Sequence, residues 1–156
     1  PHRVVKLIVA DIAPVHYDAH HQQIITALSS VNFDIENTRR EVDRQLSKTI
    51  SNLGVRQFLL KNLRITENQK ISWKMNLKGI SQNYKNIQAG MAVDTTFLKP
   101  VLFIAGGLSD YIKPEHRNIT LNLFPKAKMK VISDTTHWLH AEKPRIFVNI
   151  CLRFLQ

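Results

Sequence analysis

Three short apolar runs, far apart in the chain, restrict the possible fold more than any other feature of the sequence. They are residues 4–10, 101–105 and 128–132. The first two are continuous rather than alternating, as in strands of a parallel sheet whose two faces are both covered by helices. The third alternates lysine with apolar residues, which predicts a strand nearer an edge. The sequence therefore predicts an α/β fold with three parallel strands.

Helical patterns fill the long gap between the first two runs. They predict helices over residues 18–31 and 34–53, with Asp34 as the N-cap of the second. Gly54 is expected to break the chain before a third helix over residues 55–63. The clearest amphipathic stripe predicts a fourth helix, because its members recur at helical spacing: Trp73, Leu77, Ile80, Tyr84 and Ile87. Such stripes are normally core or interface surface.

The order of the elements predicts a division of the chain into three parts. Pro114 and Pro144 stand where a first helical residue is expected, so helices should cover residues 114–123 and 144–155. Strand and helix then alternate over residues 99–156, which implies right-handed parallel crossovers. Residues 1–15 provide the first strand and an acidic loop. Residues 16–98 are too long for a simple crossover, and we expect a helical lid over a site at the strand ends.

Composition excludes several classes of protein. The chain has 156 residues, 44% of them hydrophobic and 22% charged, as in an ordinary soluble domain. No apolar run approaches the roughly 20 residues of a transmembrane segment. Net charge is +10, and residues 34–85 hold eleven Lys or Arg against five Asp or Glu. A solvated face explains this scattered charge, with attraction to an anionic lipid surface or substrate as the alternative. We expect no nucleic-acid partner, because no binding motif accompanies the charge.

Cysteine and histidine usage predicts neither a disulfide nor a metal site. Cys151 is the only cysteine, and its apolar helical surroundings predict a small buried hydrophobe rather than a reactive thiol. His137 and His140 are three residues apart, and further histidines open the insertion at residues 16–21. Neither group matches H-E-x-x-H or a Cys/His cluster. We therefore predict no metal and no cofactor.

Three loops follow the three predicted strands, and each carries a group with possible chemistry. In open α/β sheets, ligands and catalytic groups gather beyond the carboxyl ends of the strands. Asp11 follows the first strand, Asp110 the second and His137 the third. An aspartate can hold an imidazole in the right tautomer for general-base catalysis, although either aspartate can equally be a turn or capping residue. Ser109 is a poor nucleophile candidate, because it lacks the strand–turn–helix elbow that exposes a reactive hydroxyl.

Four motifs resemble one subfamily of α/β hydrolases. Residues 137–144 read His-Trp-Leu-His-Ala-Glu-Lys-Pro, similar to the segment around that subfamily's catalytic histidine. Residues 11–14 (Asp-Ile-Ala-Pro), 103–109 (Phe-Ile-Ala-Gly-Gly-Leu-Ser) and 123–127 (Leu-Phe-Pro-Lys-Ala) resemble three further signatures. The subfamily is that of alpha/beta hydrolase domain-containing protein 11 and its bacterial acyl-ester hydrolase relatives. The resemblance covers essentially the whole chain, as the C-terminal half of the family's domain.

The resemblance implies a serine hydrolase of acyl esters or lipids, with diacylglycerol and thioesters as candidate substrates. It implies His137 as general base and Asp11 as the acid of the triad, with Asp110 as the alternate acid. Trp138 and Trp73 are the candidate residues of the substrate pocket, and core packing is the other interpretation of Trp138. It also implies mitochondrial residence for the animal members.

Two departures from the family pattern matter. The family's nucleophile lies in Gly-His-Ser-Met-Gly, ahead of the first strand found here, and this sequence contains no Gly-x-Ser-x-Gly. Because the chain begins at Pro1, we expect a missing N-terminal half and no catalysis by the chain alone. The alternative is a truncated, non-catalytic isoform that binds a partner or lipid surface. Thr136 also stands where the family usually places glycine, and a β-branched residue disfavours positive φ, so Thr136 is expected to re-aim His137.

Overall fold

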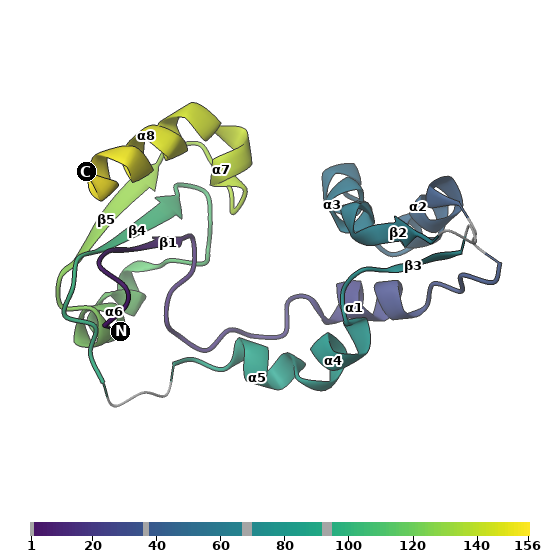
Figure 1. Cartoon of the computed structure of the whole chain (residues 1–156), viewed down its shortest axis with the longest axis horizontal. Helices are drawn as coiled ribbons and strands as arrows, with labels where there is room; N and C mark the ends of the chain where they lie inside the picture. The colour runs from purple at the N-terminus through teal and green to yellow at the C-terminus, as the bar shows by residue number, and fades with distance from the viewer. Residues whose placement is uncertain (1, 36–37, 67–69, 92–94) are drawn as a thin grey trace. The chain divides into compact units, whose positions relative to one another are not determined.

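The chain forms two compact units in a computed structural model that describes residues 2–35, 38–66, 70–91 and 95–156 (Figure 1). The first unit contains Pro1–His16 and Gly90–Gln156, and the second contains Tyr17–Ala89. The first unit is thus assembled from the two ends of the chain, with the second unit inserted between them in sequence.

A parallel sheet organises the first unit. It contains β1 (Leu7–Ala10), β4 (Val101–Gly106) and β5 (Ala127–Ile132), in the spatial order β1-β4-β5. Both pairs of neighbouring strands are parallel, which confirms the predicted parallel sheet with the third run at an edge. The first strand begins three residues later than the apolar run that predicted it.

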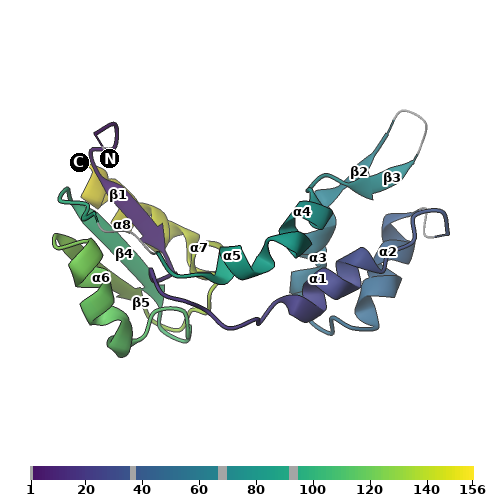
Figure 2. The ribbon, with the colours of Figure 1, turned by 90° about the horizontal axis from the view of Figure 1, so that it is seen from below.

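Alternate residues of the central strand β4 pack on opposite faces of the sheet. Leu102 and Ile104 face a cluster that includes the apolar side of α8 (Pro144–Leu155) and Leu139 of α7 (Leu139–Glu142). Val101 and Phe103 face the other cluster, which α6 (Arg117–Leu123) completes. Figure 2 shows α6 and α8 on opposite sides of the sheet. All six residues of β4 are buried, as expected for a strand covered on both faces.

The two prolines begin helical segments as the sequence predicts. Pro144 is the first residue of α8. Pro114 begins a short 3₁₀ turn, η2 (Pro114–His116), which leads directly into α6. Proline is favoured at such positions because its fixed φ suits a helix and its missing N–H would have no partner there.

The second unit is built from five helices, a 3₁₀ turn and a small hairpin among the residues described. Its elements are α1 (Gln22–Ser29), α2 (Arg39–Ser47), α3 (Leu53–Leu59), η1 (Leu60–Asn62), β2 (Leu63–Ile65), β3 (Ile71–Trp73), α4 (Leu77–Gln82) and α5 (Tyr84–Gln88). Leu28, Val42, Leu46 and Leu60 lie in its buried core. The predicted insertion of four helices is therefore wrong in both the number and the type of elements.

Capping side chains explain two of these differences. The helix predicted from Asp34 begins instead at Arg39, because Thr38 and Glu41 form a reciprocal capping box; residues 36 and 37 lie outside the described part. Gly54 does not interrupt the chain before the next helix. It lies inside α3, whose N-cap Asn52 accepts a hydrogen bond from Val55 N at 3.1 Å.

The long stripe from Trp73 to Ile87 is not one helix. Trp73 ends β3, which pairs with β2 in an antiparallel hairpin that places Leu63 opposite Trp73. Asn76 then caps α4 by accepting a hydrogen bond from Gly79 N at 3.0 Å, and Asn83 separates α4 from α5. The spacing of the apolar residues is preserved, but the asparagines divide the segment because their side chains compete for backbone hydrogen bonds.

Candidate active site

The candidate site lies at the carboxyl ends of the three parallel strands. Asp11 follows β1, residues 107–110 follow β4, and His137 lies between β5 and α7. The loops after β4 and β5 are joined by backbone hydrogen bonds, from Gly107 N to Ile132 O at 2.9 Å and from Leu108 N to Thr135 O at 2.8 Å. Parallel pairing thus brings together groups that are more than 90 residues apart in sequence.

Asp11 is the buried centre of this site. It is 0% exposed, and its backbone adopts φ 49°, a left-handed conformation that is rare outside glycine. Its N–H still donates to Ile104 O at 2.8 Å, which continues the β1–β4 ladder. Aspartate adopts this conformation more readily than most other non-glycine residues, and here it turns the chain sharply after β1.

His137 lies against the Asp11 carboxylate. The distance from His137 Nδ1 to Asp11 Oδ2 is 2.8 Å, and an ionised carboxylate can only accept, so Nδ1 carries the proton in this contact. The histidine side chain is 48% exposed, and its ring stacks on Tyr111 with centroids 4.2 Å apart. A histidine held through Nδ1 by a buried acid leaves Nε2 as the nitrogen able to accept a proton.

Two further groups hold the Asp11 carboxylate. Gly106 N donates to Oδ1 at 2.9 Å, and the Ser109 hydroxyl donates to Oδ2, the same oxygen that His137 contacts. Sequence reasoning considers Ser109 only as a poor nucleophile and does not predict its hydrogen bond to Asp11. A signal was available, because Ser109 lies in the short loop after β4, and the loops after neighbouring parallel strands meet at one edge of the sheet.

The predicted alternate acid lies elsewhere. Asp110 is exposed, and within the described residues no hydrogen bond or ion pair joins it to His137. Asp11 and Asp110 were equally placed at strand ends by the sequence pattern. The structure brings Asp11 and not Asp110 to the histidine.

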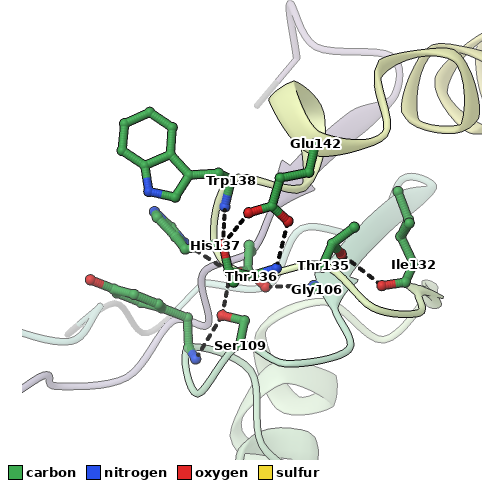
Figure 3. A network of polar contacts seen from close by, with 10 residues as sticks. Gly106, Ser109, Ile132, Thr135, Thr136, His137, Trp138 and Glu142 are labelled. Atoms are coloured by element: carbon green, nitrogen blue, oxygen red, sulfur yellow. Dashed lines mark hydrogen bonds and ion pairs between the residues drawn. The ribbon is translucent and has the colours of Figure 1, made fainter. Parts of the chain in front are cut away.

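A polar network fixes the loop that carries His137 (Figure 3). Glu142, the last residue of α7, accepts from Thr136 N at 2.8 Å through one carboxylate oxygen and from Thr136 Oγ1 at 2.6 Å through the other. Both hydrogen bonds hold the pKa of Glu142 below its ordinary value, and the one from the Thr136 hydroxyl has the larger effect. Among the described non-glycine residues only Asp11 and Asp134 have a positive φ, so Thr136 does not. The β-branched side chain is therefore accommodated without strain at φ.

The candidate pocket residues are both half-buried tryptophans. Trp138 lies beside His140, with ring centroids 6.3 Å apart. Trp73 packs in the second unit, where its indole N–H donates to Leu28 O at 3.1 Å and its ring lies edge-on to Phe33 at 5.4 Å. A cavity of about 530 Å³ in the first unit is lined by residues of β4, β5, η2 and α6, and by Gly107 and Ser109 of the loop after β4. Neither tryptophan lines this cavity.

The described part of the chain contains no group of three or more His, Cys, Asp or Glu side chains arranged to hold a metal ion. None of its helices has the length and apolar character needed to span a bilayer.

An acid after one strand and a histidine after another, in a parallel sheet covered by helices on both faces, define the class of this protein. The chain belongs to the α/β-hydrolase superfamily, and its first unit corresponds to the C-terminal half of that fold. No protein-family model matches the sequence.

Relatives place the chain more finely. It is 37% identical over 162 residues to the zebrafish (Danio rerio) sn-1-specific diacylglycerol lipase ABHD11, covering 100% of this chain and 51% of that protein. It is 34% identical to esterase YbfF of Escherichia coli over 98% of this chain and 58% of YbfF. The solved structure of a marine microorganism esterase is 42% identical, with a TM-score of 0.92 over 97% of this chain and 61% of that one. The chain thus spans about half the length of the curated relatives it matches.

Proposed function

We propose that this chain provides the general base and the acid of a serine hydrolase that acts on acyl esters or lipids. The observation that carries the proposal is the 2.8 Å contact between His137 Nδ1 and the fully buried Asp11 carboxylate. In this role Asp11 fixes the imidazole tautomer, and His137 Nε2 removes the proton from a serine hydroxyl and returns it to the leaving group. The names of the relatives, a diacylglycerol lipase and esterases, support the substrate class.

We propose that the nucleophilic serine comes from outside these 156 residues. Ser109 is the serine nearest the pair, but its hydroxyl donates to Asp11 Oδ2 and therefore lies on the Nδ1 side of the histidine. A serine activated by His137 has to approach Nε2, the opposite ring nitrogen. Without that serine the covalent route is absent, so the chain alone is expected not to turn over esters.

The test compares the chain alone with a chimera. In the chimera, this chain replaces the matching C-terminal part of the zebrafish lipase, so that the relative supplies the rest of the domain. We expect the chimera to react with a fluorophosphonate probe and to hydrolyse short p-nitrophenyl esters, and the isolated chain to do neither. Stoichiometric labelling of a serine in the isolated chain would show that the nucleophile lies within it and would overturn the proposal.

A matched pair of histidine variants makes the test specific. His137→Gln in the chimera should lower kcat by a factor of about 10³ or more, since it removes the base while leaving the fold intact. His140→Gln, three residues away on α7, is the control and should change kcat by less than about threefold. Equal loss of activity in both variants would argue against a specific role for His137.

A further inference from the structure

Thr136, the residue before His137, is bonded both to the Glu142 carboxylate and to the backbone of Trp138, the residue after His137. Thr136 donates its N–H and its hydroxyl to the two oxygens of Glu142, at 2.8 and 2.6 Å. Its Oγ1 also accepts a hydrogen bond from Trp138 N at 3.3 Å. A threonine hydroxyl has one proton to donate and lone pairs to accept, so all three contacts can be present together (Figure 3). The Thr135–Thr136 and His137–Trp138 peptide groups are thereby held relative to α7.

The residue after Glu142 holds the other end of the same loop. Lys143 Nζ donates to Ser133 O at 2.7 Å, and Asp134 Oδ2 lies 3.4 Å from the same nitrogen. Adjacent residues at the end of α7 thus hold the loop at Ser133 and at Thr136. The loop has little freedom to pivot between these points.

The opposite side of the loop is confined by β4. A methyl group added to Gly106 would lie 2.8 Å from Thr135 O and would also collide with Thr136 O. Gly106 N is meanwhile committed to Asp11 Oδ1 at 2.9 Å. The Thr136 backbone is therefore held between Glu142 on one side and the strand that positions Asp11 on the other.

We propose that Thr136 and Glu142 act as positioning residues for His137, forming a latch that keeps its Nδ1 aimed at Asp11. This inference rests on the proposed pairing of His137 with Asp11 and adds the device that maintains it. The latch consists of Thr136 and Glu142, which act on the backbone of the loop and not on the imidazole itself. His137 is about half exposed, and its ring is held on one side by stacking on Tyr111 and at Nδ1 by Asp11. Both contacts depend on where the loop places the His137 backbone, which is what the latch controls.

The tautomer of His137 reports directly on the latch. Nitrogen-15 shifts of the imidazole ring distinguish the Nδ1–H from the Nε2–H form in the full 156-residue chain. The resonance is assigned by its loss in His137→Gln, since the sequence has seven histidines. We expect Nδ1–H to dominate in the unsubstituted chain at neutral pH. Thr136→Val, which removes the hydroxyl, and Glu142→Gln, which presents a donor where the latch needs an acceptor, should both shift the population toward Nε2–H.

Conservative and remote variants provide the controls. Thr136→Ser keeps the hydroxyl and should retain the Nδ1–H form, and Glu115→Gln changes an exposed glutamate outside the network and should have no effect. In the chimera with the zebrafish lipase, Thr136→Val and Glu142→Gln should lower kcat about tenfold with KM unchanged. Circular dichroism establishes that each variant is folded. If Thr136→Val does not fold, Glu142→Gln alone tests the latch.

The Asp11→Asn variant separates failure of the latch from failure of the proposed function. If Asp11→Asn shifts the tautomer while Thr136→Val and Glu142→Gln leave it unchanged, the latch is wrong and the Asp11–His137 pair stands. If Asp11→Asn itself leaves the tautomer unchanged, the pair and the function built on it are wrong.

Discussion

Three hydrogen-bond donors converge on the Asp11 carboxylate, and this concentration explains its burial. Gly106 N–H, the Ser109 hydroxyl and His137 Nδ1–H all point at one side chain that is 0% exposed. A charge removed from water is tolerated only when such donors replace the lost hydration. The left-handed turn at Asp11 is the backbone conformation that presents the carboxylate to all three.

This convergence predicts that the two candidate acids respond very differently to the same substitution. In the chimera, Asp11→Asn should lower kcat by about 10³-fold, because an amide donates as well as accepts and favours the wrong imidazole tautomer. Asp110→Asn changes an exposed carboxylate and should leave kcat within about threefold. Steady-state hydrolysis of p-nitrophenyl esters measures both. A larger loss for Asp110→Asn would assign the acid to the β4 loop instead.

At the residue scale, the sequence predicts well where the reactive groups lie. It predicts less well which of them form hydrogen bonds with one another. The rule that catalytic groups follow parallel strands placed Asp11, Asp110 and His137 at one edge. The choice between the aspartates depends on the loop dihedrals that turn one carboxylate inward, which no periodicity encodes. For the same reason the sequence does not predict the hydrogen bonds that Ser109 and Thr136 form through their hydroxyl groups.

The lowered pKa of Glu142 predicts that the stability of the folded chain depends on pH in a specific way. The two hydrogen bonds from Thr136 lower its pKa in the folded chain, with a smaller contribution from the Lys143 charge. A glutamate whose folded pKa lies below its unfolded value contributes stability above the unfolded pKa and loses it as the pH falls through the folded value. Above about pH 5, the Glu142→Gln variant should therefore have a lower Tm than the unsubstituted chain. This difference in Tm should disappear as the pH is lowered into the acid range. A difference that persists or grows in acid would contradict the hydrogen-bonded carboxylate.

Short elements in the second unit depend on local side-chain caps. The capping box of α2 pairs Thr38 with Glu41: Thr38 N donates to Glu41 Oε2 at 2.9 Å, and Glu41 N donates to Thr38 Oγ1 at 3.2 Å. The nine-residue helix that follows carries the buried Val42 and Leu46. Helices this short are marginal in isolation, so a cap contributes a sizeable part of their stability.

Removing the cap should therefore destabilise α2. Thr38→Ala is expected to lower the free energy of opening of α2 by about 1 kcal/mol, whereas Thr38→Ser should preserve it. Amide hydrogen exchange of α2 residues is the appropriate measurement, because a chain with two units need not unfold in one step. Thr49→Ala, an exposed threonine beyond the helix end, is the control. Equal effects at Thr38 and Thr49 would mean that the capping box contributes nothing specific.

At the element scale, continuous patterns were predicted well and interrupted ones poorly. The apolar runs of β4 and β5 and the proline that begins α8 were each visible in a few consecutive residues. The stripe beginning at Trp73 satisfied a helical period, yet its first member lies in a hairpin of two three-residue strands. Strands this short carry too few residues to establish a period of two, so pairing between distant segments decided the outcome.

The two edges of the sheet in the first unit differ in chemical character. At one edge β5 carries Lys128 and Lys130, and charged residues of this kind discourage further strand pairing. At the other edge β1 pairs with β4 alone among the described residues, and its side chains are mostly half-buried despite their apolar nature. Lys6 does not protect that edge, because its Nζ donates to Phe154 O and Leu155 O at 2.9 Å each. Val5, next to it, is 72% exposed.

The chain in isolation is therefore expected to self-associate through β1. Size-exclusion chromatography with light scattering should show an average mass that rises with protein concentration. Val5→Lys adds a charge at that edge and should lower the association, measured as a dimerisation constant, by about tenfold. Val131→Lys is the matched control, since Val131 is also exposed, at 58%, but lies on the lysine-bearing β5. A concentration-independent monomer, or an equal effect of the two substitutions, would show that β1 is not the associating edge. In the chimera we expect the relative's half of the domain to cover β1, so the same Val5→Lys change should no longer alter the oligomeric state.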